Sequence, residues 1–187
     1  MSLRYGENPH QKGRFVGDFD AIFDKLNGKE ISYNNILDID AALKLMSEFQ
    51  DTTFAILKHN NSCGLATRED IKEAYLAALA CDPVSAFGGV LIANREIGID
   101  AAQEINKLFF EIIIAPSYTV EALELLQSKK NRIVLRQKSA VKWSTKTRTA
   151  LNGMLSQDAD LAIENRAEWK VATKRIPKTS QMEDLEF

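Results

Sequence analysis

Short apolar runs alternate with amphipathic stretches through the middle of the chain. Four runs are short and lack polar alternation, which predicts strands covered on both faces. These runs are Phe54–Leu57, Gly89–Ala93, Ile112–Ala115 and Ile133–Leu135. Before and between them, apolar positions recur at helical spacing, which predicts helices over about 38–49, 67–79, 101–109 and 119–126. The alternation predicts an α/β fold, with a mainly parallel sheet and helices on both faces.

The segments that join these elements are the first places to look for a site. His59 to Ala66 has no apolar period and is predicted to be a loop, and Thr67 with Asp70 resembles a capping box that begins the next helix. In open α/β sheets, ligands bind outside the carboxyl ends of the strands. The sequence therefore predicts a site at that edge of the sheet.

Overall charge argues against nucleic acids and membranes as partners. The chain has 24 Lys and Arg against 26 Asp and Glu, a net charge of −2, so no general positive field attracts a polyanion. Its apolar runs are far shorter than the roughly 20 residues that span a bilayer. One stretch is locally basic and contains no acid: Lys129, Lys130, Arg132, Arg136, Lys138, Lys142, Lys146 and Arg148. This stretch is either a solvated basic face or a local funnel for an anionic small molecule.

Metal and redox chemistry have little support in the sequence. Cys63 and Cys81 form no CxxC pair, and the H-x-E and P-C-x-x-C motifs of zinc deaminases do not occur. No Walker loop or G-x-G-x-x-G fingerprint occurs either. We expect no metal, two small buried cysteines and, since no leader precedes the first motif, a reducing cytoplasm.

Lys58 and His59 directly follow a predicted strand and are the candidate catalytic pair. An imidazole can take a proton from a nucleophile, and an ammonium can stabilise an oxygen that becomes anionic. This combination suits acyl transfer. The alternative is a surface lysine beside a histidine that hydrogen-bonds its own loop.

Other polar and aromatic positions are candidates for substrate binding. Gly88 allows close backbone approach and Phe87 can cover a flat ring, although Phe87 can equally fill the core. Glu111 can anchor amide or hydroxyl donors or simply be solvated. Arg4 offers a fork for phosphate and Tyr5 a stacking face, unless the terminus is disordered.

Five stretches, in this order, resemble one family: residues 3–11, 28–35, 58–64, 81–89 and 113–116. The family is the bifunctional purine-biosynthesis enzymes that join aminoimidazole-carboxamide ribonucleotide (AICAR) transformylase to IMP cyclohydrolase. The resemblance implies the amino-terminal half of the transformylase domain, with a cytidine-deaminase-like three-layer fold. Residues 1–50 would be a leading segment and first helix, 51–136 the αβ core, and 137–187 a less regular tail. Its last residues, 184–187, would begin a bridge to the second half.

The resemblance also implies an activity and the residues that perform it. The family transfers a formyl group from the co-substrate 10-formyltetrahydrofolate to the 5-amino group of AICAR, in purine biosynthesis and without a metal. By the resemblance, His59 is the general base and Lys58 stabilises developing charge or assists the leaving nitrogen. The positions that match the family's substrate-binding residues are Arg4, Tyr5, Asn35, Phe87, Gly88 and Glu111.

The expected partners are a small nucleotide and a folate, with a homodimer in the full-length protein. One departure from the family pattern is Ser62, where the family usually has proline. We expect the chain to be inactive alone. The alternative is a nucleotide-binding or dimerising module without catalysis.

Overall fold

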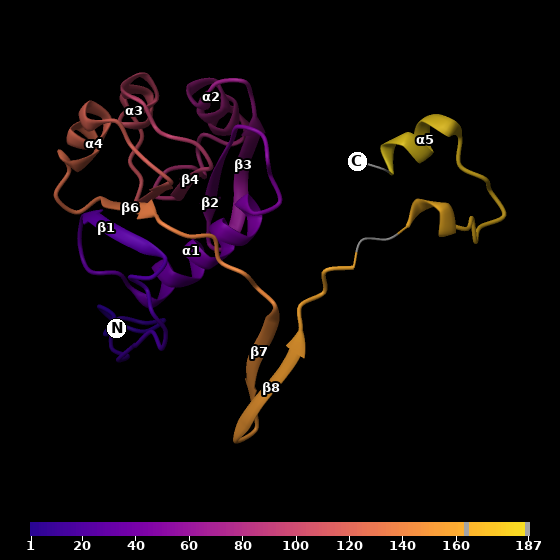
Figure 1. Cartoon of the computed structure of the whole chain (residues 1–187), viewed down its shortest axis with the longest axis horizontal. Helices are drawn as coiled ribbons and strands as arrows, with labels where there is room; N and C mark the ends of the chain where they lie inside the picture. Colours follow the sequence, from indigo (N-terminus) through magenta and orange to yellow (C-terminus); the bar gives the residue numbers. More distant parts are fainter. Residues whose placement is uncertain (163–164, 186–187) are drawn as a thin grey trace. The chain divides into compact units, whose positions relative to one another are not determined.

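The computed structural model describes residues 1–162 and 165–185, which form two compact units, residues 1–141 and 142–187 (Figure 1). Each unit is described by itself. The predicted bridge at 184–187 falls partly on Glu186 and Phe187, which lie outside the described residues.

A six-stranded mixed sheet forms the centre of the first unit. Its spatial order is β1-β6-β5-β4-β2-β3. The strands are β1 (Phe23–Asn27), β2 (Thr53–Lys58), β3 (Asn61–Thr67), β4 (Val90–Ala93), β5 (Ile112–Ala115) and β6 (Ile133–Gln137). β4, β5 and β6 are parallel, whereas the pairings β1·β6, β2·β4 and β2·β3 are antiparallel. The α/β class is therefore confirmed, and the parallel arrangement is limited to three neighbouring strands.

Helices cover both faces of this sheet, as predicted. They are α1 (Tyr33–Met46), α2 (Ile71–Cys81), α3 (Ile99–Ile105) and α4 (Val120–Gln127). Alternate strand residues such as Ile56, Leu91 and Ile113 share one core cluster with α2, α3 and α4. On the other face lies α1, which packs against β2 and β4 (Figure 1). The buried strands carry apolar residues on both faces because each face has its own helices.

The predicted loop from His59 to Ala66 is wrong, because most of this segment is strand β3. His59 and Asn60 have φ values of 52° and 66°. Two consecutive residues with positive φ suit a tight hairpin turn, so β2 and β3 pair directly. The next helix begins later than predicted: Asp70 is the N-cap of α2, and its side chain accepts hydrogen bonds from the amides of Lys72 and Glu73.

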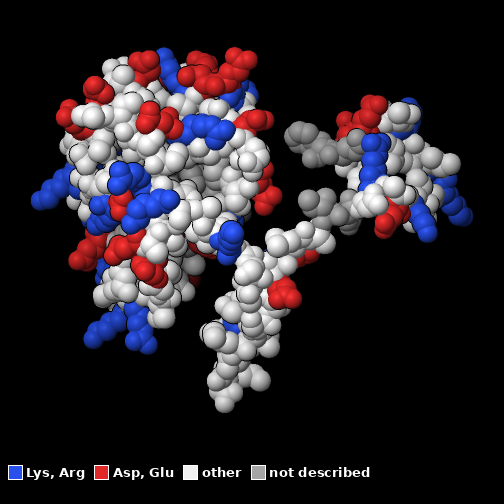
Figure 2. All heavy atoms as spheres, viewed as in Figure 1, with Lys and Arg blue, Asp and Glu red and all other residues white. Residues whose placement is uncertain are grey.

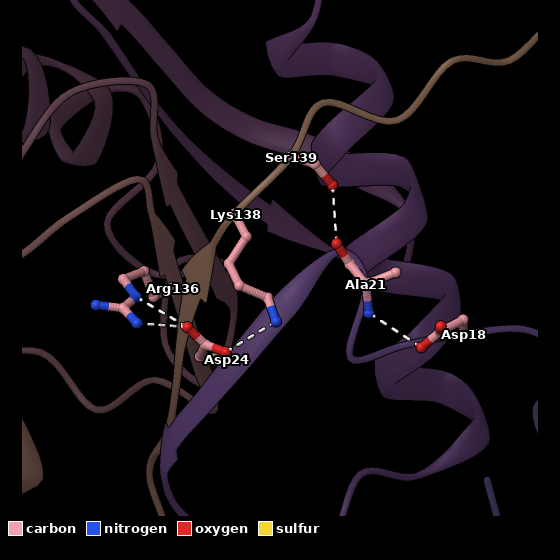
Figure 3. A network of polar contacts seen from close by, with 6 residues as sticks. All are labelled: Asp18, Ala21, Asp24, Arg136, Lys138 and Ser139. Atoms are coloured by element: carbon pink, nitrogen blue, oxygen red, sulfur yellow. Dashed lines mark hydrogen bonds and ion pairs between the residues drawn. The ribbon is translucent and has the colours of Figure 1, made fainter.

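Strand β1, which the apolar pattern did not predict, is attached to β6 by polar contacts (Figure 3). Asp24 accepts hydrogen bonds from Arg136 and forms an ion pair with Lys138 at 3.0 Å. The Arg136 hydrogen bonds, followed by that from Lys138, lower the pKa of Asp24. Ser139 adds a hydrogen bond to the carbonyl of Ala21. Two cations of the basic stretch thus share one carboxylate within the fold.

The second unit consists of exposed elements. β7 (Thr145–Ala150) and β8 (Gly153–Asp158) form an antiparallel hairpin. A short 3-10 helix, η1 (Arg166–Glu168), and α5 (Thr179–Asp184) follow. Among the described residues, no helix combines the length and apolar character needed to cross a bilayer.

Candidate functional site

The end of β2 lies beside the beginnings of β4, β5 and β6. The register pairs Leu57 with Val90, Val90 with Ile112, and Ile112 with Ile133. Because β2 runs antiparallel to β4, Lys58 emerges where those three strands start. We call this edge, formed by residues 58–60 and the residues before β4, β5 and β6, the hairpin end of the sheet.

This geometry corrects the predicted location of the site. The carboxyl-end rule holds for Lys58, but Phe87, Gly88 and Glu111 precede their strands. They approach Lys58 because β2 runs antiparallel to β4. The end of β2 therefore lies at the same edge of the sheet as the start of β4. The rule applies to all strands of a parallel sheet, and this sheet is mixed.

Lys58 projects onto the turn that precedes β4. Its Nζ donates a hydrogen bond to the carbonyl oxygen of Phe87 at 2.8 Å. Among the described residues, no carboxylate lies within ion-pair distance of this ammonium. Its hydrogen-bond partner is therefore neutral, although its charge contributes to lowering the pKa of Asp82 from beyond ion-pair distance, after the hydrogen bonds to Asp82 from Ser85 and Val84. His59 follows in the turn and is exposed.

Phe87 and Gly88 form an aromatic surface next to Lys58. Phe87 is 59% exposed, so the alternative that it fills the core is wrong. Its ring lies 5.0 Å from that of Phe109, which is 55% exposed. The amide of Gly88 donates to the carbonyl of Phe109 at 2.8 Å, and this glycine has a φ of 75°. Phe109 was predicted to lie on the third helix, but α3 ends at Ile105.

Glu111 joins the start of β5 to the segment before α1. Its Oε2 lies 2.5 Å from Nζ of Lys29, and both side chains are partly exposed. Its amide donates to the carbonyl of Gly89 at 3.0 Å. Lys29 was not among the predicted site residues, because nothing in its local sequence indicates a partner 82 positions away (111 − 29).

Asp38, on α1, is a second residue that the sequence did not indicate. Its Oδ1 accepts a hydrogen bond from the amide of Asn60 at 2.8 Å, so α1 holds the hairpin turn. Burial raises the pKa of Asp38, and the nearby charges that act on it are those of His59 and Glu111. Asp38 therefore lies between the hairpin turn and the start of β5.

Three predicted residues, Arg4, Tyr5 and Asn35, lie around the start of α1. Asn35 is buried and forms a capping box with Ser32, a structural role that occupies its side-chain oxygen. Arg4 donates to the hydroxyl of Tyr5 at 2.7 Å, and its amide bonds to the carbonyl of Ile31. The alternative of a disordered terminus is thus wrong for this segment. No hydrogen bond or ion pair among the described residues joins these three to Lys58 or His59.

Comparison with known proteins identifies the family. The chain matches the family described as AICARFT/IMPCHase bienzyme over residues 1–187. The chain belongs to this family. It is 59% identical, over 99% of its length, to the bifunctional purine biosynthesis protein PurH of Bacteroides thetaiotaomicron. It is 44% identical over its whole length to the PurH proteins of Lactococcus lactis subsp. lactis and Bacillus thuringiensis. It spans 36% to 38% of the length of these relatives.

The cysteines of this AICARFT/IMPCHase family member differ from expectation. Cys81 is exposed at the end of α2, and Cys63 is only partly buried. Burial raises the pKa of the Cys63 thiol, which disfavours the thiolate form that acts as a nucleophile. Among residues 1–162 and 165–185, no group of three or more His, Cys, Asp or Glu side chains is arranged to hold a metal ion.

The hairpin end brings an ammonium without a carboxylate partner next to an exposed pair of aromatic rings. The imidazole of His59 lies on the following residue. The ion pair of Lys29 with Glu111 borders the same edge.

Proposed function

We propose that this chain is the amino-terminal half of an AICAR transformylase domain. It supplies the catalytic pair and part of the nucleotide site for formyl transfer from 10-formyltetrahydrofolate to the 5-amino group of AICAR. The observation that carries the proposal is the hydrogen bond from Lys58 to Phe87. It sets an unpaired cation beside an exposed aromatic surface, in a chain that belongs to the AICARFT/IMPCHase family.

The reaction forms a bond between the amino nitrogen of AICAR and the formyl carbon. It breaks the bond between that carbon and N10 of the folate. His59 accepts the proton that leaves the amine, and one proton is returned to the departing N10 by the protonated His59 or through Lys58, so that no net proton is gained or lost. An aromatic amine conjugated with a carboxamide is a weak nucleophile, and general-base catalysis contributes typically 10²- to 10⁴-fold.

Lys58 stabilises the oxygen of the formyl group as it becomes anionic, or assists the departing nitrogen. An ammonium bonded to a neutral carbonyl keeps its charge for this purpose, whereas a carboxylate partner would cancel most of it. Phe87 and Gly88 bind the planar part of a substrate. Glu111 accepts hydrogen bonds from hydroxyl or amide groups, and Arg4 and Tyr5 bind the nucleotide from the leading segment.

The chain spans little more than a third of the length of its relatives. The rest of the site is then supplied by a protein of the relatives' full length that carries this chain, which we call the complete protein. We propose that a second half, similar in its cytidine-deaminase-like fold, supplies much of the folate site and that the complete protein is a homodimer. The 187-residue chain alone is then inactive. Formyl transfer by this chain at the rate of the complete protein would contradict this part of the proposal.

The test is the substitution His59→Ala in the complete protein. We expect turnover to fall about 100-fold or more, with little change in AICAR affinity, because the general base is lost while the binding contacts remain. Lys72→Ala, at the opposite end of the sheet, is the control and should retain turnover. Unchanged turnover in His59→Ala would remove His59 from this role and would favour a nucleotide-binding or dimerising module.

A further inference from the structure

A basic cleft adjoins the hairpin end and has no role in the chemistry described above. It has a volume of about 540 Å³ and is lined by the loops before β5 and β6, together with Lys29. Five cations line it: Lys29, Lys107, Lys129, Lys130 and Arg132. Glu111 is the one acid among its lining residues.

Arg132 is the most informative of these cations because it is 94% buried (100 − 6). Its Nη1 donates to the side-chain oxygen of Asn106 at 2.8 Å and to the carbonyl of Leu126 at 3.2 Å. Its guanidinium lies 4.2 Å from the centre of the Phe110 ring. All these partners are neutral. A guanidinium stays charged in a protein, and a buried charge without a counter-charge is costly.

The cations at the mouth of the cleft are also incompletely neutralised. Lys29 is paired with Glu111 and Lys107 with Glu104. Lys129 and Lys130 are exposed, and no ion pair of either exists within the described part of the chain. The cleft therefore carries more positive than negative charge. Its buried cation, Arg132, has only uncharged hydrogen-bond acceptors.

The cleft is continuous with the candidate site through Phe109 and Glu111. Phe109 lines the cleft and packs against Phe87, whose carbonyl holds Lys58. Glu111 lines the cleft and bonds to Gly89 at the start of β4. One ligand can thus contact the aromatic pair with its ring and the lysines with a charged end.

We propose that the basic cleft is a subsite for an oxyanion, a phosphate or a carboxylate, carried by the ligand whose flat ring lies on Phe87 and Phe109. The assignment of that ring rests on the proposed function, but anion binding by the cleft does not. Under the proposed function, the anion is the phosphate of the nucleotide or a carboxylate of the folate. Lys129, Lys130 and Arg132, the first cations of the basic stretch, then belong to an anion site and not to a solvated face.

The experiment is a titration of the 187-residue chain at low salt, followed by the NMR signals of backbone amides. The probes are inorganic phosphate and glutarate. We expect saturable shifts of the amides in 106–111 and 128–132. The double variant Lys129→Ala/Lys130→Ala should bind about tenfold more weakly, because both substitutions remove exposed charges that face the anion. The control Arg68→Ala/Lys72→Ala removes the same charge from the opposite end of the sheet and should change affinity less than about twofold.

The two probes distinguish the sources of the anion. Tighter binding of phosphate assigns the cleft to the nucleotide, tighter binding of glutarate assigns it to the folate, and equal binding supports an unselective oxyanion site. The proposal is overturned if neither probe shifts these amides up to about 10 mM, or if both double variants weaken binding equally. The two proposals can fail separately. Unchanged turnover in His59→Ala would overturn the proposed reaction and leave the titration result standing, whereas absent amide shifts would overturn the cleft and leave the turnover result standing.

Discussion

The two ends of the central sheet have opposite chemistry. At the hairpin end lie an ammonium without a carboxylate partner, two exposed aromatic rings and a basic cleft. At the opposite end, α2, α3 and α4 begin, around a cleft lined by acids: Asp70, Glu73, Glu96, Asp100 and Glu121. Figure 2 shows acidic side chains gathered over α2 and α3 at the top of the first unit.

This difference shows why the start of a helix does not by itself mark an anion site. Helix amino termini carry partial positive charge and free amide groups. At two of the three helix starts these groups already have side-chain partners, whereas Gly98, the N-cap of α3, offers none. Asp70 caps α2 and Thr119 caps α4, and Glu121 lies in the first turn of α4. Acidic side chains thus surround the three helix starts, whereas the hairpin end has cations without a carboxylate partner.

The largest expected effect that separates the two ends is on catalysis. Lys58→Met in the complete protein should lower turnover roughly 10²- to 10³-fold, because a preorganised charge at the reacting oxygen is lost. Lys72→Met is the matched control, since Lys72 lines the acidic cleft at the opposite end. Steady-state kinetics of the two variants measure the contrast. Equal turnover in both would remove the hairpin end from the reaction.

A second, smaller effect concerns the backbone of the turn beside Lys58. Gly88→Ala should destabilise the chain by about 1–2 kcal/mol, because its φ of 75° disfavours residues with a Cβ. Space is not the cause, since an added Cβ would meet only Phe109, at 3.8 Å. Urea unfolding measures the loss. Gly153→Ala, where nothing lies within 4 Å, is the control, and a loss as large there would contradict the conformational explanation.

Most of the first unit was predictable from its sequence, because buried strands and amphipathic helices leave strong patterns. The run Ile112–Ala115, for example, is a fully buried strand in the structure. Strand β3 was missed because its two buried residues, Gly64 and Ala66, are small and give no apolar run, and β1 because only Phe23 among its residues is buried. Local periodicity records burial, so an edge strand with one solvated side gives little signal.

The sequence supplied candidate site residues but not their arrangement. Lys58, Phe87, Gly88 and Glu111 were found from turn chemistry and from the family resemblance. The site was predicted at the carboxyl ends of parallel strands. In the structure β2 is antiparallel to β4, so only Lys58 and His59 follow a strand there, and the other residues precede theirs. Asp38 and Lys29 were missed, because the first contacts Asn60 and the second contacts Glu111 through tertiary structure alone.

The smallest expected effect is on stability, and it compares one carboxylate at each end of the sheet. Burial raises the pKa of Asp38 above its ordinary 3.8 in the folded state. A raised pKa stabilises the fold below the unfolded pKa, and this stabilisation is lost as pH rises through the folded pKa. Asp38→Asn should therefore be slightly more stable than the unsubstituted chain at pH 7, and the gain should vanish below about pH 3.8.

Asp100→Asn at the opposite end should have the reverse sign. Asp100 lies in the first turn of α3, where a negative charge stabilises a helix by about 0.3–1 kcal/mol. Its loss should lower stability at pH 7. Denaturant unfolding of both variants at pH 7 and pH 3 provides the comparison. Destabilisation by Asp38→Asn at pH 7 would show that the charge on Asp38 is favourable, contrary to the direction of its pKa.

The most direct test of the central claim is hydrogen exchange of the complete protein with and without AICAR, read by mass spectrometry of peptides. The account predicts that the nucleotide protects the segments 58–64, 84–89 and 107–111 at the hairpin end. It predicts no protection of 68–73, 96–101 and 119–121, where the three helices begin. Protection confined to the helix starts would place the ligand at the other end of the sheet and contradict the account.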